Sequence, residues 1–120
     1  MIESFDLDPK LDFDLIYLGD FELCQVRLMP SEFNPWVVLI PKRNGITEWH
    51  HLSPEDQTLL QKELNVTSKA LEKYFSPSSL NVGALGNIVN QFHLHVIARF
   101  ESDPAWPGPV WGNDRGTNQE

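Results

Sequence analysis

Two histidines, His93 and His95, lie two residues apart in the segment NQFHLHVIARF, residues 90–100. An imidazole can bind a metal, transfer a proton or attack phosphorus. Side chains alternate across a strand, so Phe92, Leu94, Val96, Ala98 and Phe100 share one face, and Gln91, His93, His95, Ile97 and Arg99 share the other. The first face is wholly apolar and is expected to lie on the core. The second is largely polar and is expected to point away from the core.

Three interpretations of the histidine pair are open from the residues alone. The first is a solvated sheet face that carries two histidines by chance. The second is a metal site, for which His50 and His51 are the other histidines of the chain, although neither Cys-x-x-Cys nor His-Glu-x-x-His occurs. The third is a phosphate-reactive pair in which one imidazole attacks phosphorus.

The segment NVGALGN, residues 81–87, precedes the histidines and favours the third interpretation. Glycines allow a ligand to approach the backbone closely, and exposed N–H groups can hold an anion. Taken by itself, the same segment is also consistent with a twisted strand that contains a bulge. Its position directly before a His-x-His strand is what favours a phosphate site.

The elements that must position these residues can be predicted from the hydrophobic pattern. Ser53 is a suitable helix N-cap, Pro54 suits the first helical position, and Pro77 ends a helix of about 22 residues, or about 33 Å. Strand patterns cover residues 15–20, 21–29, 36–40, 80–88 and 91–100. The sequence therefore predicts an α+β domain with a mainly antiparallel sheet of about five strands and one long helix packed on it.

The two ends of the chain have a different composition. The first 14 residues are mostly apolar and acidic, and a short helix or turn is expected there. Residues 101–120 are rich in proline and glycine, so they cannot form regular structure, but Trp106 and Trp111 indicate that residues 105–111 pack on the domain. The expected division is a domain over residues 1–112 and a loose tail over residues 113–120.

Charge and composition exclude several classes of function. The net charge of −8 argues against a nucleic-acid or anionic-membrane binder, which would need a basic face. Cys24 is the single cysteine, so an intrachain disulfide is impossible and a reducing compartment is expected. The N-terminus lacks the apolar region of a signal peptide, and no apolar run approaches about 20 residues. A cytoplasmic protein is therefore predicted.

Together these motifs resemble the histidine-triad (HIT) superfamily of nucleotide hydrolases and transferases. The family's strand reads His-φ-His-φ-His-φ-φ, where φ is apolar, and here QFHLHVI supplies Gln91, His93 and His95 at the three histidine positions. The segment NVGALGN is similar to the family's segment before the triad, and WVVLIPKR is similar to its strand that ends in Pro-Lys-Arg.

The resemblance implies roles for the matching residues. His93 would attack the α-phosphorus of a nucleotide and form a covalent nucleotidyl-histidine, and His95 would orient or protonate groups at the phosphate. Nucleotide or phosphate contacts would come from Asn81, Gly86, Asn87, Gln91 and Arg99. The implied protein is a homodimeric hydrolase or nucleotidyl transferase that acts on phosphoramidates, phosphoanhydrides or dinucleoside polyphosphates and uses no metal or other cofactor.

Three departures from the family pattern support alternatives to this enzyme. Gln91 replaces the first triad histidine, but its backbone carbonyl can still accept a hydrogen bond from His93. Trp36 stands where the family often has a histidine near that first position, so a rebuilt contact between Trp36 and Gln91 is hypothesised. Ile88 cannot donate a hydrogen bond to a leaving group. The alternatives are a non-catalytic nucleotide-binding module and a His-x-His metal-binding protein.

Overall fold

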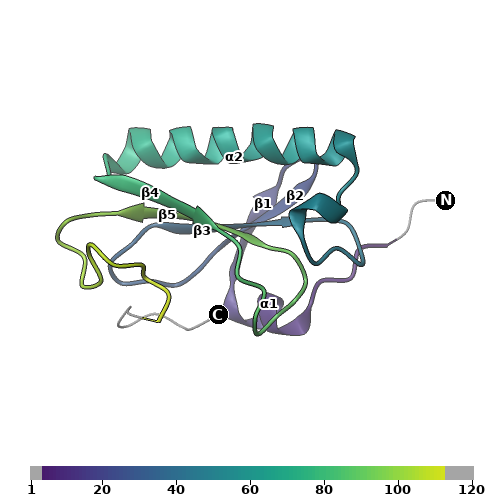
Figure 1. The fold of residues 1–120 in the computed structure, drawn as a ribbon, viewed down its shortest axis with the longest axis horizontal. Helices are drawn as coiled ribbons and strands as arrows, with labels where there is room; N and C mark the ends of the chain where they lie inside the picture. The colour runs from purple at the N-terminus through teal and green to yellow at the C-terminus, as the bar shows by residue number, and fades with distance from the viewer. Residues whose placement is uncertain (1–3, 113–120) are drawn as a thin grey trace.

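The computed structural model describes residues 4–112. Five strands form one antiparallel sheet in the order β1-β2-β3-β5-β4, and the long helix α2 lies across one side of it (Figure 1). The elements in chain order are α1 (Pro9–Asp14), β1 (Ile16–Asp20), β2 (Cys24–Leu28), β3 (Trp36–Pro41), the 3₁₀ turn η1 (Trp49–His51), α2 (Pro54–Phe75), β4 (Ser79–Gly83) and β5 (Leu94–Arg99). The predicted α+β class is confirmed.

Helix α2 begins and ends where its capping residues predict. The Ser53 hydroxyl accepts a hydrogen bond from the backbone N–H of Asp56 at 3.1 Å, and Pro54 is the first helical residue. Its buried stripe consists of Leu60, Glu63, Thr67 and Leu71. The Glu63 carboxylate accepts from the backbone N–H groups of Leu23 and Cys24 at 2.8 and 2.9 Å, which satisfies this buried charge.

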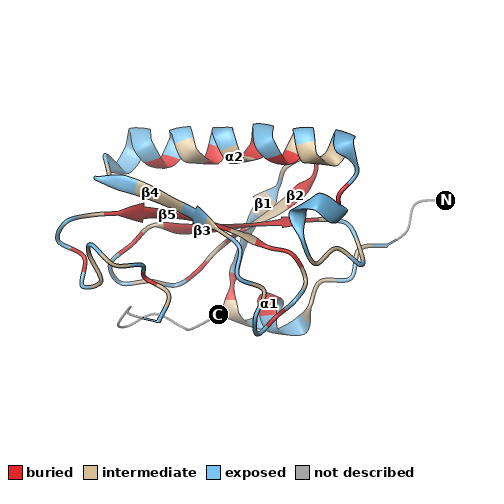
Figure 2. Cartoon of the chain, viewed as in Figure 1, coloured by how far each residue is buried: buried red, intermediate tan, exposed pale blue. Residues whose placement is uncertain are grey.

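The sheet is covered on both faces, whereas the histidine face was expected to point away from the core (Figure 2). Every residue of β3 is buried. Val37 and Leu39 of β3 pack beneath α2, whereas Trp36, Val38 and Ile40 belong to a second cluster on the opposite face. This second cluster is completed by Leu11, Leu15, Met29, Val89, Ile97 and Val110.

The histidine face of β5 belongs to that second cluster, so the expectation that it points away from the core was wrong. Alternation along a strand shows which residues share a face, but it does not show what covers that face. The cover comes from the short helix α1, from the connection after β4 and from the proline-rich segment after β5, and the hydrophobic pattern could not predict where these three regions pack. The prediction that residues 105–111 pack on the domain is confirmed.

Strands β4 and β5 are both shorter than predicted. Strand β4 ends at Gly83, and β5 begins at Leu94, so Gln91 and His93 lie in the connection between them. No described helix is long and apolar enough to cross a membrane. The predicted loose tail, residues 113–120, lies outside the described residues.

Candidate active site

The ring orientation of His93 is fixed by the backbone of Gln91. The Nδ1 atom of His93 lies 2.7 Å from the carbonyl oxygen of Gln91. A carbonyl oxygen can only accept, so Nδ1 must carry the proton, and in a neutral ring Nε2 then holds the lone pair. The carbonyl of Gln91 was predicted to fill this position. His93 is only 1% exposed, so its Nε2 atom lies inside the protein.

The Gln91 side chain attaches the N-terminal segment to the loop that carries His93. Its amide oxygen accepts from the backbone N–H of Asp8 at 2.8 Å, and its amide nitrogen donates to the carbonyl of Asp6 at 2.9 Å. The carboxamide has its donor and acceptor side by side and can pair with a backbone as a neighbouring strand does. An imidazole has its two nitrogens on different sides of a ring and could not make this pair of contacts.

His95 is held from two sides by tryptophans. The indole Nε1–H of Trp36 donates to Nδ1 of His95 at 2.9 Å, and the indole of Trp111 lies edge-on to His95 with ring centroids 5.5 Å apart. His95 is 0% exposed, and its ring centroid is 5.1 Å from that of His93. The hypothesised contact of Trp36 with Gln91 is therefore corrected, because the Trp36 indole bonds to His95.

Gly83 on β4 gives Trp111 its place beside His95. Gly83 pairs with His95 across the sheet, and a Cβ built on Gly83 would lie 3.3 Å from the Trp111 ring. Among the described residues, the buried Nε1–H of Trp111 has no hydrogen-bond acceptor. Ring contacts with His95 and Trp36 therefore hold this indole, and no hydrogen bond from its own nitrogen does.

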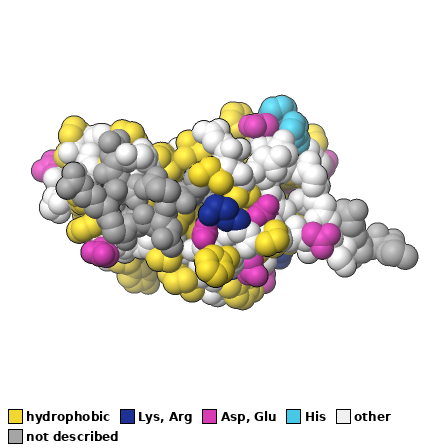
Figure 3. Space-filling model, turned by 90° about the horizontal axis from the view of Figure 1, so that it is seen from below, with side chains coloured by type: hydrophobic (Ala, Val, Ile, Leu, Met, Phe, Trp, Pro, Cys, Tyr) yellow, Lys and Arg dark blue, Asp and Glu magenta, His cyan; other side chains and the backbone are white. Residues whose placement is uncertain are grey.

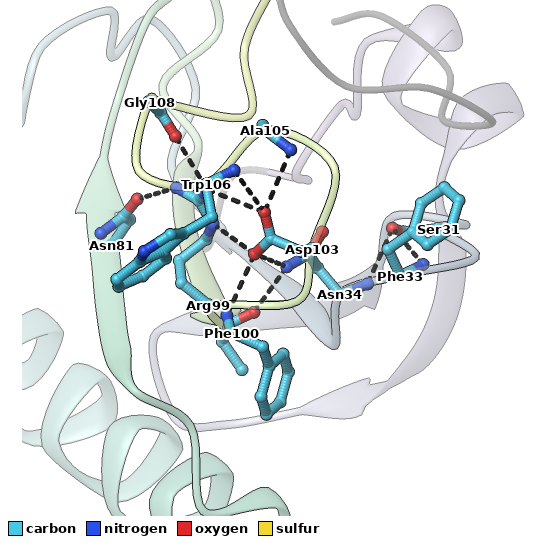
Figure 4. A network of polar contacts seen from close by, with 11 residues as sticks. Ser31, Phe33, Asn34, Asn81, Arg99, Phe100, Asp103, Ala105, Trp106 and Gly108 are labelled. Atoms are coloured by element: carbon cyan, nitrogen blue, oxygen red, sulfur yellow. Dashed lines mark hydrogen bonds and ion pairs between the residues drawn. The ribbon is translucent and has the colours of Figure 1, made fainter.

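Arg99 lies on the same strand face but is fully engaged inside the protein (Figure 4). Its Nε and Nη2 atoms donate to the Asp103 carboxylate at 2.9 and 3.0 Å, and Nη1 donates to the Asn81 side-chain oxygen at 2.7 Å. Nη2 also donates to the carbonyl of Gly108 at 2.7 Å. The phosphate-binding role of Arg99 and Asn81 stays a prediction; in this structure the two side chains bind each other, and Arg99 also binds Asp103.

Asp103 is the centre of this network and was not identified from the sequence. Burial by itself would raise the pKa of this carboxyl group. Hydrogen bonds from Arg99, from the backbone N–H of Phe100 and from the Asn34 amide outweigh burial and hold its pKa well below the usual range. The carboxylate also accepts from the backbone N–H groups of Ala105 and Trp106, so it orders the turn that follows β5.

Comparison with known proteins places this geometry in a family. A family model described as "HIT domain" matches residues 12–102. The chain belongs to the HIT family. HIT-domain proteins are generally nucleotide-binding hydrolases or transferases.

Solved structures agree with this assignment. A HIT protein from Sinorhizobium meliloti is 46% identical, with a TM-score of 0.90 over 97% of this chain and 85% of that one. HIT proteins from Bradyrhizobium japonicum and Marinobacter aquaeolei are 36% and 43% identical, with TM-scores of 0.92 and 0.90. They cover 98% and 94% of this chain, and 87% and 82% of their own. No match was found among curated proteins.

The glycine- and asparagine-containing segment of this HIT domain forms the loop between β4 and β5. Gly86 has a φ of 65°, a left-handed conformation that glycine adopts without strain. Asn87 and Ile88 are exposed, whereas Val89 is buried in the cluster beneath the sheet. The loop thus buries Val89 in this cluster and leaves Asn87 and Ile88 at the surface.

The other chemical groups of this HIT domain do not form a second site. Within residues 4–112, no group of three or more His, Cys, Asp and Glu side chains is placed to hold a metal ion. His50 and His51 lie exposed on η1, with their rings 4.7 Å apart. Burial, and after it the nearby Glu63 carboxylate, raises the pKa of the Cys24 thiol, so this cysteine is not a nucleophile.

Figure 3 views the molecule from the side opposite α2, where hydrophobic side chains are interspersed with charged and other polar atoms and histidine appears only near one edge. Four surface cavities are lined by other parts of the chain, and neither His93 nor His95 lines any of these four. His93 and His95 are 1% and 0% exposed, so both rings lie beneath the surface.

Proposed function

We propose that this HIT protein is a nucleotide hydrolase or nucleotidyl transferase that acts through a covalent intermediate on His93. The observation that carries the proposal is the 2.7 Å contact between Nδ1 of His93 and the Gln91 carbonyl. It leaves the lone pair on Nε2, and a neutral imidazole with a defined lone pair is what a histidine nucleophile requires. The second imidazole, His95, lies next to it.

In the proposed reaction, Nε2 of His93 forms a bond to the α-phosphorus while the bond from phosphorus to the leaving group breaks. The leaving group departs with that electron pair. The His93 ring gains positive charge, which the carbonyl of Gln91 stabilises by accepting the Nδ1–H hydrogen bond. Water then attacks the phosphorus, the electrons of the P–N bond return to Nε2, and a proton passes to solvent. A second acceptor in place of water would give transfer. We assign phosphate or ribose contacts to Gly86 and Asn87.

Substrate access requires part of the cover to move, and we assign this movement to the segment that ends in Trp111. The Trp111 indole contacts His95 and Trp36 through ring packing and makes no hydrogen bond of its own among residues 4–112. Nucleotide bases stack on aromatic rings. A displaced Trp111 could therefore exchange its ring contacts in the closed site for contacts with a bound nucleotide.

The direct test is a turnover assay of the purified protein on nucleoside phosphoramidates, nucleoside polyphosphates and dinucleoside polyphosphates. We expect nucleoside monophosphate to be released from at least one class. Tight nucleotide binding without any release would contradict the enzyme and support the alternative, a nucleotide-binding module. The near-complete burial of His93 is the observation that favours that alternative.

We also propose that the protein is a cytoplasmic homodimer. Large apolar side chains are exposed near the end of α2 and on the adjoining sheet edge, among them Leu18, Phe33, Tyr74 and Phe75. Contiguous apolar surface of this kind is typical of protein–protein contacts. Sedimentation equilibrium at two protein concentrations should give twice the chain mass of 13.8 kDa. A single-chain mass at both concentrations would contradict the dimer.

A further inference from the structure

We propose that Trp36 is a positioning residue that keeps His95 neutral, with its proton on Nε2, and thereby selects the leaving group. The inference rests on the proposed function and names its substrate class. Nucleotidyl substrates whose leaving group departs as an anion, such as phosphoanhydrides, would be preferred over substrates that lose an amine. The observation behind it is the hydrogen bond from the Trp36 indole to Nδ1 of His95.

The direction of this hydrogen bond is fixed by chemistry. An indole nitrogen can only donate, so Nδ1 of His95, 2.9 Å away, must be the acceptor and carries no proton. A neutral His95 then has its proton on Nε2. His93 is in the opposite state, because the carbonyl of Gln91 forces the proton onto Nδ1. At the Nε2 position, His93 therefore presents a lone pair and the neighbouring His95 presents an N–H group.

Protonation of His95 to imidazolium is opposed by the same contact. A proton on Nδ1 would end the hydrogen bond and leave the Trp36 N–H buried without its acceptor. Trp36 cannot easily turn away, because it lies on the central strand β3, is buried, and packs against both His95 and Trp111. The ring of His95 is therefore expected to remain neutral under conditions where a solvated histidine would be charged.

A neutral His95 can stabilise a leaving group but cannot readily give it a proton. Donation of the Nε2 proton from a neutral ring would produce an imidazolate, which is a strong base. His95 can thus offer a hydrogen bond to developing negative charge, which is electrostatic stabilisation and not general acid catalysis. A phosphate leaving group departs as a weakly basic anion and needs no more than this. An amine departs from phosphorus only after its nitrogen is protonated.

On β3, β4 and the C-terminal segment, the described residues that contact His95 include Trp36, Gly83 and Trp111, and none of these three can act as a general acid. His93 is the titratable ring in contact with it. Arg99, further along the same strand face, is ion-paired with Asp103. Protonation of His93 would stop attack on every substrate. Its effect therefore cancels when kcat/KM for one substrate is divided by kcat/KM for another.

The experiment compares kcat/KM for a dinucleoside polyphosphate and for a nucleoside phosphoramidate with the same base, in the wild type and in Trp36→Phe, from pH 5 to 8. The wild type should favour the polyphosphate by at least about tenfold across this range. In Trp36→Phe, the ratio should move toward the phosphoramidate below about pH 6.5, the ordinary pKa of histidine. Trp49→Phe, which alters an exposed tryptophan, should keep the wild-type ratio.

The outcomes separate this inference from the proposed function. If the wild type cleaves the phosphoramidate at least as fast as the polyphosphate, the inference is overturned and the proposed function stands. If the wild type turns over neither substrate, the proposed function is overturned. Nitrogen-15 NMR of the wild-type imidazoles gives a readout that does not depend on a folded variant. It should show His95 with a protonated Nε2 and an unprotonated Nδ1 from pH 6 to 8. A protonated Nδ1 would overturn the inference.

Discussion

Replacing His93 by alanine is expected to lower kcat/KM for nucleoside monophosphate release by at least about a thousandfold. The substitution removes Nε2, the atom that would attack phosphorus, and no described residue beside it can replace that atom: the neighbouring His95 presents an N–H group from its Nε2. A steady-state assay measures the loss. Wild-type protein denatured at alkaline pH, where the P–N bond of a nucleotidyl-histidine is stable, should also carry one added nucleotidyl group by intact mass, and the variant should carry none.

Two further variants show whether such a loss is chemical. His93→Asn keeps much of the buried volume and should be as inactive as the alanine variant, with an unchanged circular dichroism spectrum. His51→Ala removes an exposed histidine and should retain wild-type activity. Full activity in His93→Asn would show that another group attacks phosphorus.

The fold could be predicted well where local chemistry decides it. Ser53, Pro54 and Pro77 predicted the limits of α2, because caps and prolines act on the backbone beside them. The continuous apolar run at residues 36–40 predicted a strand, and β3 (Trp36–Pro41) is buried throughout. Alternation also placed His95 and Arg99 on one face of β5 correctly, since side-chain direction in a strand follows residue number.

The cover of the site could not be predicted, because it depends on contacts between distant parts of the chain. Gln91 reaches the backbone 83 and 85 residues away, and no local pattern predicts which backbone a side-chain amide will meet. Arg99 was assigned to a phosphate or nucleotide because the family resemblance implied that role, and its partner within the protein was not predicted. That partner is Asp103, and its place in a proline-rich segment gave no sign that it turns back onto the strand.

A common principle explains the state of both histidines. Each Nδ1 contacts a group that can play only one part in a hydrogen bond: an acceptor, the Gln91 carbonyl, for His93, and a donor, the Trp36 indole, for His95. The acceptor at His93 is a backbone carbonyl, which any residue at position 91 would supply, whereas the donor at His95 is the side chain of Trp36. The identity of residue 36 therefore matters for the proton of His95 in a way that the identity of residue 91 does not matter for the proton of His93.

The largest effect on stability is expected at the buried ion pair of Arg99 with Asp103. Asp103→Ala should lower the free energy of unfolding by about 3–5 kcal/mol, because it leaves a guanidinium that is 1% exposed without its counter-charge. The double variant Arg99→Leu with Asp103→Leu should lose less than the sum of the two single changes, since neither charge is then left alone. Urea unfolding at pH 7 measures all of these variants.

An exposed ion pair offers the matched control. Asp14→Asn breaks the pair with Lys10, which is 43% exposed at its side chain, and should cost less than about 1 kcal/mol. A loss of the same small size in Asp103→Ala would contradict the structural role given to the network.

The pH dependence of stability follows from the same carboxylate. The pKa of Asp103 is depressed in the folded protein, so its contribution is fully present above the ordinary carboxyl pKa of about 3.9 and is lost as the pH falls below that value toward the folded pKa. Urea unfolding between pH 5 and 2.5 should show a steeper loss of stability in the wild type than in Asp103→Asn. Equal slopes would mean that the pKa of Asp103 is the same in the folded and the unfolded protein.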